Sequence, residues 1–314
     1  MNAEGTVAEV LAGAAKWSSL VGDVRETLRY VPDGSAQTCV TSPPYYGLRD
    51  YGTAGQIGQE QSPAEYVAAM VAVMREVRRV LADDGTLWLN LGDSYVAAAS
   101  GKTSGDPHAK STVSVNANVR AARGQSADKT KFGLPEKNLI GIPWRTALAL
   151  QDDGWILRAE IIWAKGSPMP EAATDRPTRE HEHVFLFSKR PRYFYDASAI
   201  EERGADGPRN ARTVWEINAS GCAEAHFATM PPELARRCIL AGSRKGDVVL
   251  DPFGGAATTA LVALQHGRRA LLCELNPEYV EIQRRRLADF TADTSSPVRV
   301  EAPEWGALFA ATKP

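Results

Sequence analysis

The sequence predicts an α/β fold, with a mostly parallel sheet covered by helices on both faces. Short apolar segments typical of buried strands alternate along the chain with segments whose apolar residues recur at helical spacing. Two of the predicted strands, ending near residues 40 and 251, run directly into loops rich in proline or glycine, where open sheets of this class bind ligands. No internal repeat divides the 314 residues, so we expect one domain, 1–314, with insertions.

The helix after the first of these loops has the clearest boundaries. Ser62 suits the N-cap, Pro63 the first helical position, and Glu65 completes a capping-box pattern. Apolar residues then recur at helical spacing as far as Val80. The other expected elements are a strand near 19–21, a short helix after residue 23, strands at 38–40 and 86–91 (the latter after a turn at Asp84-Gly85), a helix at 143–150, strands at 155–163 and 183–188, a helix at 232–240, a strand–turn–helix start at 247–259, a helix at 260–267 and a strand at 269–273.

The first loop, residues 41–45, reads Thr-Ser-Pro-Pro-Tyr and follows the predicted strand 38–40. Its two prolines fix φ and lack N–H groups, while their carbonyls stay free as acceptors. A small hydroxyl precedes them and an aromatic ring follows. This set suits a planar base with an amino group, because the ring can stack on the base while the hydroxyl and a proline carbonyl accept from its N–H groups. Taken alone, the segment could equally be a proline-rich surface turn.

The second loop connects a strand to a helix within 247–259. Its small residues allow a cofactor to approach the backbone closely. The next strand, 269–273, ends at Glu274, and an acid at that point can bind both ribose hydroxyls of a nucleoside cofactor. A nicotinamide dehydrogenase would need G-x-G-x-x-G to seat a pyrophosphate, but residues 254–257 are Gly-Gly-Ala-Ala. A nucleoside without phosphates fits better, and S-adenosylmethionine is the obvious one.

Together these motifs resemble those of the DNA amino-methyltransferases of the circularly permuted β group. Residues 41–45 are similar to the family's catalytic (D/N/S)PP(Y/F) motif, and residues 251–259 to its DPFxGxGTT cofactor loop. Residues 273–279 resemble the strand end and helix start that follow this loop. In the permuted group the catalytic motif precedes the cofactor motif, and the order here agrees.

The match spans roughly 20–290, with a gap near 97–137. The two main motifs in combination are highly specific for the family. One position departs from the pattern: the second glycine usual in the cofactor loop is Ala257. Its Cβ would either clash with the turn or tighten it.

The resemblance implies a Rossmann-like S-adenosylmethionine-dependent methyltransferase sheet, circularly permuted, and a set of site residues. Asp23 lies in a Gly-Asp turn that resembles the turn approaching the cofactor adenine, and Thr229 lies in a segment, 226–231, similar to the one lining the methionine end. The implied catalytic residues are Ser42, Pro43, Pro44 and Tyr45. The implied cofactor-binding residues are Asp23, Thr229, Asp251, Phe253, Gly255, Thr258, Glu274 and Asn276.

A metal site is not expected. His181, Glu182 and His183 lack the H-E-x-x-H spacing that places two imidazoles on one helical face. We expect Glu182 and His183 to orient polar groups at the start of a strand instead.

The first residue of the (D/N/S)PP(Y/F) motif, Ser42, indicates which base is the target. Within the resemblance, Ser at this position is typical of cytosine-N4 enzymes, whereas Asp or Asn is typical of adenine-N6 enzymes. Ser42 therefore predicts a site-specific DNA methyltransferase that acts on the N4 amine of a flipped cytosine. The alternatives are an adenine-N6 DNA methyltransferase, an RNA or protein amide methyltransferase, and an inactive DNA-binding homologue. Methylation at cytosine C5 is excluded, because it needs a Cys nucleophile in a Pro-Cys context and the chain has no Pro-Cys.

Composition indicates a soluble cytoplasmic protein. The chain is 44% hydrophobic and 24% charged, as in soluble globular proteins. No apolar run approaches the roughly 20 residues that span a bilayer, so no membrane partner is expected. The first 20 residues lack a basic start followed by an apolar core, which argues against a secretory signal. The four scattered cysteines form no C-x-x-C pair and suit free thiols in a reducing cytoplasm.

Charge alone does not indicate a nucleic-acid binder, because the net charge is −2. Two regions offer local alternatives. Residues 97–137 carry seven Lys or Arg against three acids and are rich in small polar residues, so we expect a mobile basic insertion that closes on double-stranded DNA or is merely solvated. Region 165–225 combines arginines with aromatic residues and is the expected target-recognition region, although a salt-bridged surface would look similar. A cognate restriction endonuclease and a homodimer are further partners that the sequence leaves open.

Overall fold

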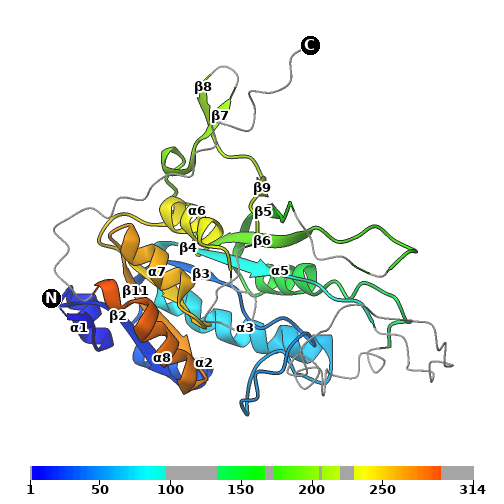
Figure 1. Ribbon diagram of the computed structural model, residues 1–314, viewed down its shortest axis with the longest axis horizontal. Coiled ribbons are helices and arrows are strands. Elements are labelled where there is room, and N and C mark those ends of the chain that lie inside the picture. The colour runs from blue at the N-terminus through cyan, green and yellow to red at the C-terminus, as the bar shows by residue number, and fades with distance from the viewer. Residues whose placement is uncertain are drawn as a thin grey trace.

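A nine-stranded mixed sheet forms the centre of the molecule (Figure 1), in the order β1-β2-β11-β10-β3-β4-β6-β5-β9. The computed structural model describes residues 2–96, 133–166, 171, 173–204, 207–219 and 230–290. Neighbouring strands are parallel except at the β4–β6 and β6–β5 pairs. The strands are β1 (Asn2–Glu4), β2 (Ala15–Val21), β3 (Ala36–Thr41), β4 (Leu81–Leu91), β5 (Ile156–Ala164), β6 (His181–Ser188), β9 (Val214–Glu216), β10 (Val248–Asp251) and β11 (Arg269–Glu274). A separate hairpin, β7 (Glu202–Gly204) with β8 (Gly207–Arg209), projects away from the sheet.

Helices cover both faces of this sheet, as predicted. The α-helices are α1 (Val7–Ala12), α2 (Val24–Thr27), α3 (Pro63–Val80), α5 (Ile142–Asp152), α6 (Pro232–Gly242), α7 (Thr258–Gln265) and α8 (Pro277–Arg286), with 3-10 turns η1 (Leu28–Tyr30), η3 (Ser198–Ile200) and η4 (Ala288–Phe290). Side chains alternate along each strand, so Val248 and Leu250 of β10 join the core under α3 and α5. Val249 between them joins the opposite core under α6 and α7.

Helix α3 begins where the sequence predicts. The Ser62 hydroxyl accepts from the Glu65 N–H, and the Glu65 carboxylate accepts from the Ser62 N–H, at 3.2 Å each. The predicted turn at Asp84-Gly85 is wrong, because both residues lie within β4. This strand starts directly after the helix at Leu81, which pairs with Ala36 of β3. The register then shifts before the next pair, and Gly85 makes this irregularity fit: a Cβ there would lie 2.9 Å from the Ala82 carbonyl oxygen.

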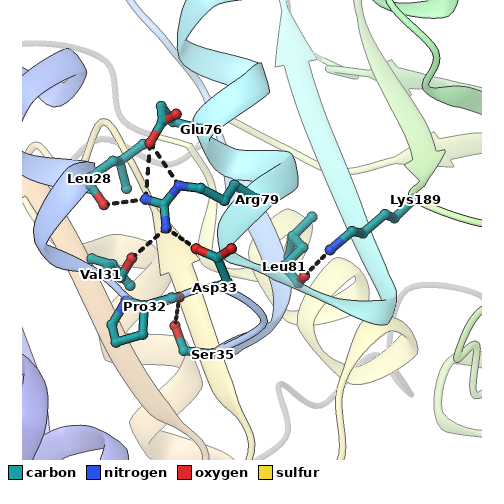
Figure 2. Close-up of polar contacts among 9 residues, drawn as sticks. All are labelled: Leu28, Val31, Pro32, Asp33, Ser35, Glu76, Arg79, Leu81 and Lys189. Atoms are coloured by element: carbon teal, nitrogen blue, oxygen red, sulfur yellow. Dashed lines mark hydrogen bonds and ion pairs between the residues drawn. The ribbon is translucent and has the colours of Figure 1, made fainter.

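At the amino ends of β3 and β4, a guanidinium ties the end of α3 to the preceding loop (Figure 2). All three nitrogens of Arg79 donate hydrogen bonds there. Lys189 also donates to the Leu81 carbonyl at 2.8 Å, just beyond the last turn of α3, where cations are favoured. The partners of Arg79 are the carbonyls of Leu28 (2.8 Å) and Val31 (2.9 Å) and the carboxylates of Asp33 (2.5 Å) and Glu76 (2.9 Å).

The connections reverse direction between β3 and β10, which are neighbours in the sheet. From β10 the chain crosses through α7 to β11 on one side, and from β3 it crosses through α3 to β4 on the other. A reversal of this kind opens a crevice at the carboxyl ends of the strands, where ligands of such sheets bind. Both predicted loops lie at this place. None of the helices in the described ranges combines the length and apolarity needed to cross a membrane.

Candidate functional site

A pocket opens at the carboxyl ends of β2, β3, β10 and β11. It brings together the two sequence motifs, which lie about two hundred residues apart in the chain. The predicted residues that line it are Asp23, Ser42, Pro44, Asp251, Phe253, Gly255, Thr258, Glu274 and Asn276. Met230 and Tyr279, which also line it, belong to the segments 226–231 and 273–279 that the resemblance had singled out, whereas the sequence did not point to Tyr51 and Ile57. Thr229 lies outside the described residues.

The cofactor loop packs tightly on the neighbouring strand. The Gly254 N–H donates to the Cys273 carbonyl at 2.8 Å, and a Cβ on Gly254 would lie 3.1 Å from the Leu272 Cβ. Gly255 has a φ of +47°, and its N–H donates to the Glu274 carboxylate at 2.7 Å. Glycine is therefore required at 254 for close packing and favoured at 255 by its backbone conformation.

Ala257 adopts the left-handed conformation for which glycine is usual, with φ +61° and ψ +33°, at the N-cap of α7. Its N–H donates to the Gly254 carbonyl at 2.7 Å and closes the turn. Its methyl group is fully buried in the core beneath α6 and α7 and is not among the groups lining the pocket. The alanine is therefore accommodated in a closed turn, and its methyl group does not obstruct the pocket.

Glu274 ends β11 with its carboxylate beside the pocket. One oxygen accepts from the Gly255 N–H and the other from the Asn276 N–H, at 2.7 and 2.8 Å. Each carboxylate oxygen can accept a second hydrogen bond, so both have capacity for a ribose hydroxyl. Burial raises the pKa of Glu274, and the two backbone hydrogen bonds oppose that shift. Asn276 has a local role as well, since its side chain caps α8 by accepting from the Glu278 N–H.

Asp251 joins the cofactor loop to the catalytic loop. Its carboxylate accepts from the hydroxyls of Thr41 and Thr259, at 2.7 Å each, and from the Phe253 N–H at 3.1 Å. Burial raises the pKa of this carboxyl, and the three hydrogen bonds oppose the shift. Because Thr41 directly precedes Ser42, Asp251 fixes the position of one loop relative to the other.

Asp23 lines the pocket and forms the N-cap of α2. Its carboxylate accepts from the N–H and the Nε of Arg25, at 2.9 Å each, and this guanidinium lowers the pKa of Asp23. Arg25 also donates to the Gly55 carbonyl at 3.3 Å. The pair thereby holds the segment after the catalytic loop against the pocket, where Tyr51 and Ile57 form part of the wall.

The catalytic motif carries a connected polar network. Ser42 Oγ lies 3.2 Å from Tyr45 Oη, which donates to Glu182 Oε2 at 2.5 Å. Asn90, at the end of β4, donates through Nδ2 to Ser42 Oγ at 3.2 Å and to Tyr45 Oη at 2.7 Å. Lys165 Nζ lies 2.5 Å from Glu182 Oε1. Sequence reasoning found Glu182 as an orienting group but missed Asn90 and Lys165.

The prolines and the tyrosine ring are held by neighbouring groups. Tyr66 Oη donates to the Pro44 carbonyl at 3.0 Å, whereas Pro43 is buried and its carbonyl has no hydrogen-bond donor within the described part of the chain. The Tyr45 ring packs against Gly92, where a Cβ would lie 2.5 Å from Cε2. The Pro43 carbonyl thus retains the acceptor capacity that an amine target needs.

The expected DNA-binding regions are only partly described. Residues 97–132 of the basic insertion lie outside the described residues. Its described flanks are joined, because the Val96 N–H donates to the Asn138 carbonyl at 2.8 Å and the Lys137 N–H donates to the Val96 carbonyl at 3.1 Å, and Lys137 pairs with Asp175 at 2.7 Å. Region 165–225 contributes Lys165, Glu182 and the β7–β8 hairpin, while residues 167–170, 172, 205–206 and 220–225 are outside the description. In the described ranges, no group of three His, Cys, Asp or Glu side chains could hold a metal ion.

The chain is similar to known DNA methyltransferases throughout most of its length. A family model described as DNA methylase, of the N6/N4 type, matches residues 36–285. The type II methyltransferase M.Cfr9I of Citrobacter freundii is 48% identical over 267 residues, covering 85% of this chain and 86% of that protein. The type II methyltransferase M.SmaI of Serratia marcescens is 46% identical over 272 residues, covering 85% and 89%.

Two solved structures share the fold. A PvuII DNA methyltransferase, described as cytosine-N4-specific, matches with a TM-score of 0.63 at 22% identity and covers 90% of this chain and 89% of its own. A DNA modification methylase of Thermus thermophilus, complexed with S-adenosyl-L-methionine, matches with a TM-score of 0.58 at 26% identity and covers 88% and 96%. The predicted Rossmann-like methyltransferase fold is confirmed, and so is S-adenosylmethionine as the cofactor of the matching family.

Proposed function

The chain belongs to the N6/N4 DNA methylase family, and from this premise we propose that it methylates the N4 amine of a cytosine flipped out of double-stranded DNA. Ser42 is the observation that carries the choice of cytosine. It is a neutral residue at the head of the catalytic motif, and Glu182 lies only two hydrogen bonds away through Tyr45. An Asp at position 42 would place a second carboxylate beside Glu182, so this pocket suits the neutral residue.

The two hydrogen-bond acceptors of the catalytic loop suit an amine that is a weak nucleophile. The lone pair of a cytosine amine is delocalised into the ring, and hydrogen bonds from its N–H groups to Ser42 Oγ and the Pro43 carbonyl favour a pyramidal nitrogen. S-adenosylmethionine supplies the methyl group on an electrophilic sulfonium. The residues of the chain therefore act by orienting the amine and dispersing the charge that develops on it.

The cofactor would occupy the pocket between the two loops. We assign the ribose hydroxyls to Glu274 and the adenine to Asp23, both of which line this pocket. Phe253, Gly255, Thr258 and Asn276 complete the wall, and Thr229 would join them at the methionine end. The fit rests on the two Glu274 oxygens, each of which has one acceptor position left.

The target base must leave the duplex to reach this pocket, because its amine is otherwise paired. We assign the stacking on this base to Tyr45, whose ring is held against Gly92 and whose hydroxyl is fixed by Glu182. Phosphate contacts are assigned to the basic insertion 97–137 and to region 165–225. A restriction endonuclease that cuts the same sequence is the partner suggested by the type II names of the relatives.

Nucleoside mass spectrometry tests the proposal. Genomic DNA from a host that expresses the protein, digested to nucleosides, should contain N4-methylcytosine that is absent from cells expressing Ser42→Ala. N6-methyladenine without N4-methylcytosine would overturn the choice of base and leave amino-methylation standing. The absence of both, from a protein that binds S-adenosylmethionine in vitro, would support the inactive homologue.

A further inference from the structure

We infer that Glu182 receives the proton that the target amine loses, through a relay formed by Ser42 Oγ and Tyr45 Oη. This deepens the proposed function and rests on it only in requiring an amine substrate. It applies to cytosine N4 and adenine N6 alike.

Three oxygens form a continuous line from the pocket to the start of β6. Ser42 Oγ lies 3.2 Å from Tyr45 Oη, which lies 2.5 Å from Glu182 Oε2. Asn90 supports all three, because its Nδ2 is 3.2, 2.7 and 3.1 Å from these atoms in the same order. Asn90 is 2% exposed, so its amide is a buried part of this network.

The direction of the hydrogen bonds follows from the carboxylate. An ionised Glu182 can only accept, so Tyr45 must donate to it. The lone pairs of Tyr45 Oη are then free to receive Asn90 and Ser42, and the Ser42 proton points toward Tyr45. This leaves a Ser42 lone pair for the amine, which can only offer N–H groups while its lone pair attacks the methyl group. Glu182 thereby makes Ser42 an acceptor without placing a charge in contact with the base.

The same line can carry the proton away. As the amine nitrogen forms its bond to the methyl carbon, the bond from sulfur to that carbon breaks and its electron pair stays on sulfur. The N–H bond then breaks with its electron pair returning to nitrogen. That proton binds Ser42 Oγ, the Ser42 proton moves to Tyr45 Oη, and the Tyr45 proton moves to Glu182 Oε2. The products are a neutral methylated amine and a protonated Glu182, which returns its proton to solvent after the base has left.

The surroundings suit Glu182 as the end of the relay. Lys165 Nζ lies 2.5 Å from the other carboxylate oxygen and balances the charge before transfer. Burial and Glu182 raise the pKa of Tyr45 well above its ordinary range, so the phenol stays protonated and passes a proton on. Among the described residues, His181 and His183 flank Glu182 along β6, and their rings contact each other while His183 is paired with Glu160 of β5 at 2.7 Å.

Two variants break the relay while keeping its shape. Glu182→Gln still accepts from Tyr45 but takes no proton, and Tyr45→Phe keeps the ring but removes the middle oxygen. Each should lower the single-turnover rate of methyl transfer to duplex DNA by about 100-fold, the lower range for proton transfer by a positioned group. The double variant should be no slower than the slower single one, because both act on the same path. Calorimetric affinity for S-adenosylmethionine should stay unchanged and shows that the variants are folded.

A pH profile separates the relay from a purely structural role. At saturating S-adenosylmethionine, the rate of the unaltered protein should fall on acidification, because a protonated Glu182 can take no second proton, and Glu182→Gln should lose this dependence. Glu160→Gln is the matched control: it removes a carboxylate one strand away and disturbs His183 but leaves the relay intact, so its rate and profile should match those of the unaltered protein.

Three results would overturn the relay. The first is a methyl-transfer rate of Glu182→Gln within a few-fold of the rate of the unaltered protein. The second is a double variant in which the rate reductions of the two single variants multiply. The third is the loss, in Glu160→Gln, of the decrease in rate at acidic pH. Methyl transfer is counted from radiolabelled cofactor on any base, so these results do not depend on which base is methylated. Failure of the base assignment is read separately, from the nucleoside product.

Discussion

The two ends of the central strands use polar side chains in opposite ways. At the amino ends, each nitrogen of Arg79 is matched by a carbonyl or carboxylate of the chain (Figure 2). At the carboxyl ends, polar groups keep unused capacity: among the described residues, the Asn90 Oδ1 is buried without a hydrogen-bond partner. Each Glu274 oxygen has one acceptor position left. Buried polar groups are normally paired, so spare capacity at one end marks the place where a ligand completes the bonding.

This contrast predicts that substitutions at the two ends will separate activity from stability. The largest effect on activity should come from Ser42→Ala. The variant loses the acceptor that serves the amine in the transition state, so methyl transfer should fall by about 100-fold or more, the scale of removing one preorganised polar group. The melting temperature and the affinity for S-adenosylmethionine should hardly change. A fall in stability comparable to the fall in rate would mean that Ser42 is part of the fold and would remove the contrast.

Arg79→Met tests the other end. The change leaves two carbonyls and two carboxylates without their donor and should cost about 2–3 kcal/mol of unfolding free energy, the range for hydrogen bonds to charged groups. Chemical denaturation measures this cost. The rate per folded molecule should be unchanged, because no atom of Arg79 approaches the pocket. Lys189→Met is a matched comparison with one hydrogen bond, to the Leu81 carbonyl, and one 3.5 Å ion pair, to the exposed Asp83, and should cost less.

The fold and the cofactor loop could be predicted from sequence because their signals are local. Ser62 and Glu65 are three residues apart, and residues 251–274 form one strand–turn–helix–strand unit. The network at the catalytic loop could not be predicted in the same way. Tyr45, Asn90 and Glu182 come from three separate segments and meet only because β3, β4 and β6 are neighbours in the sheet. No spacing in the sequence encodes that neighbourhood.

The same limit explains the elements that were missed. β1, β7, β8 and β9 are three residues long each, too short to show an alternating pattern, and their strand character comes from their partners. The contact between Thr41 and Asp251 spans 210 residues, so the role of Asp251 as a bridge between two loops was invisible although its motif was recognised. Local motifs locate a site, whereas the groups that support it depend on tertiary structure.

Glu274→Ala should have an intermediate effect confined to the cofactor. Loss of hydrogen bonds to a charged group should weaken S-adenosylmethionine binding by about 1–3 kcal/mol, measured by calorimetry. The ionised carboxylate is the form that accepts both hydroxyls, and burial raises the pKa of Glu274. Affinity in the unaltered protein should therefore decline as the pH falls, beginning above the ordinary Glu value of about 4.3. A pH-independent affinity, or an unchanged affinity in the variant, would remove Glu274 from the site.

The smallest effect is expected at Ala257, where the cofactor loop departs from the family pattern. The left-handed conformation costs an alanine about 1–2 kcal/mol relative to glycine, so Ala257→Gly should relieve that cost. The same change removes a fully buried methyl group from the core under α6 and α7, which should cost about 0.8 kcal/mol. The two terms oppose one another, and the net change in unfolding free energy should stay within about 1 kcal/mol, in favour of glycine. Since the methyl lies in the core rather than in the pocket, the affinity for S-adenosylmethionine should not change. A gain in affinity with no change in stability would show that the Ala257 methyl reaches the cofactor, and that this part of the carboxyl edge belongs to the site and not to the core.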